Sequence, residues 1–304
     1  MLYTVAKLHY VADLPQVQIA RQLGLSTATI SRLLQRARAE GIVRIEVRDP
    51  VAPEGLGARL AERLGLRQVA VVDTPAGGAL TLLANPLAQL LRGAGLGAGA
   101  VLGIGWGRTI RAVLEAGLPP MPGIEVVPAT GGMQQPAPHF QISEFVRVAA
   151  EQLQGRPHFL HAPYLASAEA RPIFLSDPTI RDTVALWGRL DALVVGVGLP
   201  HALHPPEASV ATAAERALVT SQGDVLRHYF DAAGQLIPWD GEDRLIALSV
   251  AQLRRIPLTV ALAADEAKAV SLLGAVRSGM VNAIVTDVRT AEAILALLDG
   301  DSGL

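Results

Sequence analysis

Apolar positions in the first 50 residues predict two short helices joined by a tight turn. Ile19, Ala20 and Leu23 mark one face of a short helix, and Gly24 after it suits a left-handed C-cap. Ser26 is a natural N-cap for a second helix, because its hydroxyl accepts a backbone N–H. The buried face of that helix is predicted to consist of Ile30, Leu33, Leu34 and Ala37. Two such helices are typical of the helix-turn-helix unit, whose second helix enters the major groove of DNA.

The opposite face of the second helix is polar and predicts DNA contacts. Short hydroxyls near its N-terminus suit phosphate, and longer side chains reach base edges or phosphates. Apolar and charged residues then alternate from Ile42 to Arg48, as in the wing of a winged helix-turn-helix. A helical hairpin with a solvated charged face is the alternative, but pattern, cap, turn and wing together favour DNA binding. The predicted DNA-contacting residues are Gln16, Thr27, Ala28, Thr29, Ser31, Arg32, Gln35, Arg36 and Arg44.

Beyond Pro50 and Pro53, short apolar runs alternate with helical patterns, as in a second domain. The first helical pattern runs from Leu56 to Leu64. Strands are predicted at residues 68–73, 100–104, 124–127, 192–197, 245–250, 258–262 and 282–286. Uninterrupted apolar strands belong to sheets that are buried on both faces. The sequence therefore predicts a DNA-binding domain of residues 1–50 and an α/β domain of residues 54–304, with a doubly wound, mostly parallel sheet.

Charge is distributed unevenly between these two regions. Residues 1–50 contain seven Lys/Arg and four Asp/Glu, a net charge of +3, so the rest of the chain carries −5 of the total of −2. A basic small module on an acidic large domain predicts that nucleic acid contacts only the module. The 304 residues are 50% hydrophobic and contain no cysteine, which excludes a disordered chain and a disulfide framework. No signal peptide or membrane span is visible, so we expect a cytoplasmic protein.

Glycine-rich loops follow several predicted strands, at the edge where ligands bind in such sheets. The loop from Gly103 to Thr109 comes between a strand and a helix, so its backbone N–H groups can approach an anion, although tight turns also use such glycines. Asp224 and Arg227 are expected one helical turn apart, facing one ligand or forming a surface ion pair. Lys268 is a lone lysine, which suits either a ligand or a solvated helix face.

The same loops do not predict a cofactor or a metal. Residues 103–109 lack the glycine spacing of a dinucleotide fingerprint and the Gly-Lys-Thr of a P-loop. His158 and His161 are expected on a strand, where residues three apart point to opposite faces. His201 and His204 flank a proline-rich loop without an obvious carboxylate partner. We therefore expect neither a metal centre nor a cofactor.

The run VAKLHYVADLPQVQIARQLGLSTATISRLLQRARAEGIVRIEV resembles the N-terminal domain of the SorC family of sugar-binding transcriptional regulators. The segments WGRT, ATGG, VVGVG, GDVLRHYFDAAG and SGMVNAIVTD resemble the effector domain of that family, in order. The resemblance implies a fold related to ribose-phosphate isomerase and glucosamine-phosphate deaminase, with phosphorylated sugars as effectors. By matching position, the implied effector contacts are Gly105, Gly107, Arg108, Thr109, Thr130, Gly131, Gly132, Gln141, Asp224, Arg227 and Lys268. Asp265 stands where the family often has glycine.

Three functions remain open at this point. The leading prediction is a regulator that binds double-stranded operator DNA as a homodimer or homotetramer, under control of a sugar phosphate. The main alternative is an isomerase or deaminase with an appended DNA-binding module, in which Asp224 is the best-placed general base. A third possibility is a large domain that only oligomerises. Turnover assays on sugar phosphates separate the second from the first, and thermal shifts with metabolites separate the third.

Overall fold

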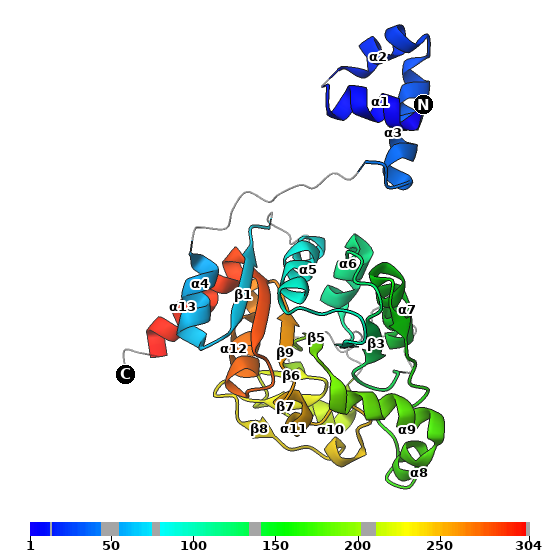
Figure 1. Ribbon diagram of the computed structural model, residues 1–304. Coiled ribbons are helices and arrows are strands. Elements are labelled where there is room, and N and C mark those ends of the chain that lie inside the picture. The colour runs from blue at the N-terminus through cyan, green and yellow to red at the C-terminus, as the bar shows by residue number, and fades with distance from the viewer. Residues whose placement is uncertain (13, 44–54, 75–79, 134–140, 202–210, 302–304) are drawn as a thin grey trace. The chain divides into compact units, whose positions relative to one another are not determined.

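The computed structural model describes residues 1–12, 14–43, 55–74, 80–133, 141–201 and 211–301, and Figure 1 shows their elements. The chain divides into two compact units, residues 1–49 and residues 50–304. Each unit has its own buried apolar cluster.

The first unit consists of three helices, α1 (Leu2–Tyr10), α2 (Gln16–Leu23) and α3 (Thr27–Ala39). Gly24 ends α2 at φ 67°, and the Ser26 hydroxyl accepts the Thr29 N–H at 3.1 Å to begin α3. Both caps confirm the boundaries that the sequence predicts. A buried cluster holds the three helices together through Val5, Ile19, Ala20, Ile30 and Leu34. Residues 44–48 of the predicted wing lie outside the described residues.

The second unit is built on a parallel sheet that contains seven of the described strands. In spatial order these are β1 (Gln68–Val72), β10 (Ala283–Asp287), β9 (Leu258–Leu262), β5 (Ala192–Gly196), β2 (Val101–Ile104), β3 (Glu125–Pro128) and β4 (Arg156–Pro157). Every neighbouring pair is parallel. The doubly wound, mostly parallel sheet and six of the predicted strands are thereby confirmed.

Helices cover both faces of this sheet (Figure 1). Alternate side chains of β5 enter different clusters: Leu193 and Val195 face one, and Ala192 and Val194 face the other. The first cluster is covered by α4 (Leu56–Leu64), α9 (Pro178–Ala185), α12 (Ala269–Arg277) and α13 (Val288–Asp301). The second is covered by α5 (Ala84–Gly93), α6 (Arg108–Ala116) and α7 (Ile142–Leu153). Burial on both faces explains the uninterrupted apolar strands.

A small antiparallel sheet lies beside the main one. It contains β6 (Gly223–Val225), β7 (His228–Phe230) and β8 (Leu236–Ile237), and the short helices α8 (Ala170–Ser176), α10 (Ala213–Arg216) and α11 (Val250–Leu253) complete the unit. The strand predicted at residues 245–250 is wrong. Leu245 and Ala247 form only isolated bridges, and Ser249 begins α11 by accepting the Gln252 N–H. No described helix has both the length and the apolar character that crossing a bilayer requires.

Candidate functional site

The exposed face of α3 carries the side chains predicted to contact DNA. Ile30, Leu34 and Ala37 are buried, and helical geometry places Arg32 and Gln35 on the opposite face. The exposed members of the predicted set are Thr27, Ala28, Arg32, Gln35 and Arg36, whereas Gln16, Thr29 and Ser31 are half-buried. Arg44 lies outside the described residues.

Two members of that set already have partners within the unit. The Thr29 hydroxyl lies 2.8 Å from the Ser26 hydroxyl at the helix cap. The Arg36 guanidinium pairs with Glu40 at 2.8 Å, one turn along the exposed surface. Exposed pairs of this kind are weak, so the guanidinium remains available to a phosphate.

In the second unit, the loop after β2 leads directly into the N-terminus of α6. Gly107 immediately precedes the helix at φ 134°, a conformation that favours glycine. No side chain caps α6, so the N–H groups of its first turn have no partner from a capping residue. The sequence therefore places Arg108 and Thr109 in the first turn of an uncapped helix, where the backbone favours an anion.

The ends of β5 and β6 come together next to Lys268. The Lys268 ammonium donates to the Val197 carbonyl at 2.5 Å. The Gly198 N–H donates to the Asp224 carbonyl at 2.9 Å, and a Cβ at Gly198 would overlap the Asp224 carboxylate. Only glycine therefore lets these two segments approach so closely.

The charges of these segments act on one another. Burial and, to a lesser extent, the Arg108 charge lower the pKa of Lys268, Asp224 and Asp265 raise it, and the resulting pKa is about 8. Residues from three separate loops thus share one electrostatic environment at the carboxyl edge of the sheet. Lys268 is mostly buried, so the alternative of a solvated helix face is wrong.

Asp224 and Arg227 are not one helical turn apart, because β6 and β7 form a hairpin. Val225 pairs with His228, so Leu226 and Arg227 are the two turn residues. Within the hairpin, the Asp224 carboxylate accepts the backbone N–H of Arg227 at 2.9 Å. The i,i+3 spacing of Asp224 and Arg227 predicts one helical turn, and that prediction is wrong because the two turn residues, Leu226 and Arg227, are neither glycine nor asparagine and give no signal of a hairpin.

The Arg227 side chain is buried, which also excludes the surface ion pair. It is 6% exposed, and its guanidinium lies 5.8 Å from the Trp106 ring centroid and 5.6 Å from that of Tyr164. Its Nη1 donates to the Tyr229 hydroxyl at 3.3 Å and lies 3.5 Å from Glu215. Burial lowers the pKa of Arg227, but Tyr229, Asp224 and Glu215 raise it more, so the guanidinium stays charged.

The glycines after β3 bring neighbouring segments together. The Gly131 N–H donates to the Ile246 carbonyl and the Gly132 N–H to the Ala162 carbonyl, both at 2.8 Å. The Thr130 hydroxyl donates to the same Ile246 carbonyl at 3.4 Å. A Cβ at Gly131 would lie 2.5 Å from the Pro163 carbonyl oxygen. The amides of both glycines are therefore engaged within the fold and are not free anion donors.

The structure also describes Gln141 and Asp265, two further positions that the resemblance names. Gln141 immediately precedes α7, next to residues 134–140 outside the described part of the chain. Asp265 has φ 116°, a conformation that favours glycine. This conformation suits the glycine that the resemblance implies at this position, and here the Asp265 carboxylate accepts the Ala267 N–H at 3.0 Å.

Sequence reasoning missed the residues that surround Arg227. These are Trp106, Tyr164, His201, Glu215 and Tyr229. Trp106 and Tyr229 lie inside recognised motifs, whereas Glu215 had only the weak signal of a capping box with Thr212. Buried polar networks between distant segments leave no periodic trace in a sequence.

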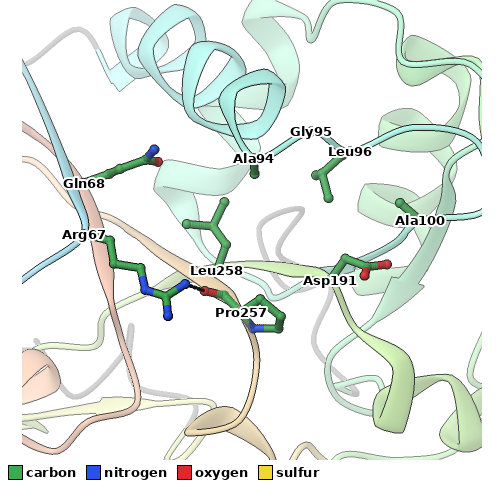
Figure 2. A pocket seen from close by; sticks show the side chains of 9 residues that line it. All are labelled: Arg67, Gln68, Ala94, Gly95, Leu96, Ala100, Asp191, Pro257 and Leu258. Atoms are coloured by element: carbon green, nitrogen blue, oxygen red, sulfur yellow. Dashed lines mark hydrogen bonds between the residues drawn. The ribbon is translucent and has the colours of Figure 1, made fainter.

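A cavity among the described residues lies at the other edge of the sheet (Figure 2). It has a volume of about 330 Å³ and is lined by Arg67, Gln68, Ala94, Gly95, Leu96, Ala100, Asp191, Pro257 and Leu258. These residues stand at the amino ends of β1, β2, β5 and β9, away from Lys268. No cluster of three or more metal-ligating side chains occurs in the described part of the chain.

Comparison with known proteins agrees with both units. A family described as "Putative sugar-binding domain" matches residues 50–296, and "Sigma-70, region 4" matches residues 7–40. The sorbitol operon regulator of Klebsiella pneumoniae is 29% identical over 97% of both chains. The chain belongs to the SorC family of sugar-binding transcriptional regulators. As a SorC-family protein, it is a sugar-responsive DNA-binding regulator of transcription.

A second relative and a solved structure extend this similarity. The deoxyribonucleoside regulator of Bacillus subtilis is 29% identical over 95% of both chains. The crystal structure of the full-length sorbitol operon regulator SorC from K. pneumoniae has a TM-score of 0.77 at 27% identity, covering 97% of both chains. Both units of the chain therefore have counterparts in single SorC-family chains.

Proposed function

We propose that the effector is a phosphorylated sugar or polyol, bound at the carboxyl edge of the large sheet. The observation that carries this proposal is the convergence of Arg108, Lys268 and the uncapped N-terminus of α6. Two cations and unpaired backbone donors are the groups that bind a phosphate. The Asp224 carboxylate beside them offers acceptors for sugar hydroxyls, which are donors. Gly105, Gly107, Thr109, Thr130 and Gln141 complete the proposed contacts.

A panel of paired ligands tests the phosphate directly. Relatives are named for sorbitol, deoxyribonucleosides and erythritol. We therefore choose sorbitol 6-phosphate, deoxyribose 5-phosphate and erythritol 4-phosphate, each against its unphosphorylated form. A rise in melting temperature with at least one phosphorylated member, and not with its partner, is expected. Stabilisation by an unphosphorylated sugar alone contradicts the proposal.

We also propose that α3 binds operator DNA in the major groove. Its exposed face carries Arg32, Gln35 and Arg36, and its N-terminus carries hydroxyls beside the helix dipole. A duplex selected from the chromosomal DNA next to the gene, compared with a shuffled duplex, is the test. Equal affinity for both duplexes at physiological salt contradicts sequence-specific recognition.

We further propose that the protein acts as a cytoplasmic homodimer or homotetramer without catalytic activity. One helix-turn-helix unit contacts few phosphates, and two-fold operators match two-fold proteins. A particle that stays monomeric in light scattering at micromolar concentration and still binds operator tightly contradicts the oligomer. Turnover of any phosphorylated member of the panel contradicts the absence of catalysis and favours the isomerase or deaminase alternative.

A further inference from the structure

The turn between β6 and β7 has a backbone conformation that its residues do not favour. Leu226 has φ 52° and Arg227 has φ 70°. A two-residue hairpin turn with both values positive normally contains asparagine or glycine. Side chains other than these persist in such a conformation only where surrounding contacts hold them. The turn therefore depends on contacts made outside the hairpin.

This turn forms part of the wall of the proposed effector site. A Leu226 methyl lies 3.3 Å from the position that a Cβ at Gly105 would occupy, so the turn packs on the loop before α6. The same hairpin carries Asp224, whose charge acts on Lys268. A displacement of the turn would move the Asp224 carboxylate and the loop at Gly105, both of which the effector is proposed to contact.

The fully buried carboxylate of Glu215 anchors the turn. Its Oε1 accepts the Tyr229 hydroxyl at 2.8 Å and lies 3.5 Å from Nη1 of Arg227. Its Oε2 accepts the Thr212 N–H at 2.6 Å, which closes the capping box of α10. One carboxylate thus joins the N-terminus of α10 to the hairpin and is the acidic partner of a buried guanidinium.

The protons of this network have a single consistent arrangement. Burial raises the pKa of Tyr229, so its hydroxyl keeps its proton and donates it to Glu215. The Tyr229 oxygen then accepts from Arg227 at 3.3 Å and from Nε2 of His201 at 3.0 Å. Burial lowers the pKa of His201, so the ring is neutral and carries its proton on Nε2. The chain of hydrogen bonds from His201 and Arg227 through Tyr229 therefore ends on the Glu215 carboxylate.

We infer that Glu215 is a positioning residue of the effector site, which fixes the strained Leu226–Arg227 turn without touching the effector. This inference rests on the proposed function. Replacing the carboxylate by an amide removes the carboxylate that forms an ion pair with the buried Arg227 guanidinium, and leaves only the charge of Asp224 to offset it. The turn then loses the anchor on its guanidinium, and the geometry of Asp224 and the Gly105 loop changes.

Fluorine NMR with 5-fluorotryptophan tests the anchoring without any ligand. The Trp106 ring lies beside the Arg227 guanidinium, and Trp239 Nε1 donates to the Arg227 carbonyl at 3.2 Å. Trp187 donates to the Pro128 carbonyl at 2.8 Å and serves as the internal reference. Glu215→Gln is expected to shift the Trp106 and Trp239 resonances and to leave Trp187 unchanged. Three unchanged resonances overturn the inference.

The control is Glu125→Gln, the same change in a half-buried pair elsewhere in the unit. Glu125 accepts from His158 at 2.8 Å at the start of β3, the edge of the sheet opposite the effector site. This variant is expected to leave the Trp106 and Trp239 resonances unchanged. If Glu125→Gln shifts these two resonances as much as Glu215→Gln does, they respond to a general loss of stability, and the inference is overturned.

Calorimetric titration with sorbitol 6-phosphate, deoxyribose 5-phosphate and erythritol 4-phosphate tests the effect on binding. Glu215→Gln is expected to lower the affinity for the tightest-binding of the three ligands by about tenfold. Glu125→Gln is expected to leave that affinity unchanged. Unchanged affinity in Glu215→Gln overturns the inference alone. Wild-type protein that binds none of the three contradicts the proposed function itself, and the inference with it.

A double variant keeps the inference testable if Glu215→Gln does not fold. Arg227→Met removes the buried charge, so Glu215→Gln in that background leaves no uncompensated guanidinium. If Glu215 acts through Arg227, the double variant binds the same sugar phosphate as tightly as Arg227→Met alone. A further loss in the double variant would mean that Glu215 acts by another route, and overturns the inference.

Discussion

The two units of the chain carry their functional side chains in opposite ways. On α3, Arg32 and Gln35 stand exposed on the outside of a three-helix cluster. At the proposed effector site, Lys268 and Arg227 are mostly buried. Lys268 donates to the Val197 carbonyl, and Arg227 pairs with Glu215 from another segment. Exposed side chains on one rigid helix act nearly independently, whereas buried charges depend on their partners.

This difference predicts how each unit responds to substitution. Losses at the DNA surface should be moderate and additive, because each arginine meets its own phosphate or base. Losses at the effector site should be larger and coupled, because each removed group leaves a partner unsatisfied. The stability of the units differs as well, since the small one has few buried residues.

The largest expected effect is on the stability of the small unit. Ile30 is fully buried in a cluster of five buried residues, so Ile30→Ala should lower the free energy of unfolding by about 2–5 kcal/mol. A unit of this size has little stability to lose, so its calorimetric transition should fall far below that of the large unit. The matched control is Ile284→Ala, fully buried in the large unit, which should leave the small unit's transition in place. A single transition that both variants lower equally would contradict independent units.

Next in size is the loss of the buried cation at the effector site. Lys268→Ala should weaken the binding of the tightest-binding phosphorylated sugar by about 1.5–3 kcal/mol, because a charge-assisted hydrogen bond is lost. The ligand concentration that gives half of the change in operator binding should rise by the same factor. Arg147→Ala, which removes an exposed charge on α7, is the matched control. Overlapping effector curves for wild type and Lys268→Ala would remove Lys268 from the site.

The sequence predicted the small unit better than the effector site. Gly24, Ser26 and the apolar spacing of α3 determine a helix-turn-helix through local rules alone, and the structure confirms them. The parallel sheet was also predictable, because burial on both faces leaves uninterrupted apolar strands.

The details of the effector site were not predictable from local rules. Leu226 and Arg227 adopt a hairpin turn against their own preference, since the contacts of Arg227 come from segments far apart in the chain. Residues 245–250 have the apolar pattern of a strand, yet the capping box that Ser249 forms with Gln252 begins a helix there. Tertiary contacts override local propensity at the hairpin turn, whereas at Ser249 a local capping signal overrides the apolar pattern.

Smaller losses are expected on the DNA surface. If Arg32 or Arg36 contacts phosphate, its change to alanine should weaken binding equally for all sequences and lower the salt slope by about 1. If it reads a base, discrimination at one position should fall by about 1–3 kcal/mol. Arg63→Ala, which removes an exposed charge on α4, is the control. Unchanged operator affinity in both Arg32→Ala and Arg36→Ala would contradict the proposal that α3 is the DNA-binding surface.

The smallest expected effect is a dependence of effector affinity on pH, which distinguishes the buried lysine from the arginines. The pKa of Lys268 is lowered to about 8 by burial, so the charged fraction falls from about 0.9 at pH 7 to about 0.1 at pH 9. The second pKa of a phosphate lies near 6, so the ligand keeps its charge over this range. Affinity for the phosphorylated sugar should therefore fall as pH rises through 8, by up to about tenfold between pH 7 and pH 9. Lys268→Arg keeps its charge at pH 9 and should abolish most of this fall in a calorimetric titration. An equal fall in wild type and Lys268→Arg would assign the titration to another group.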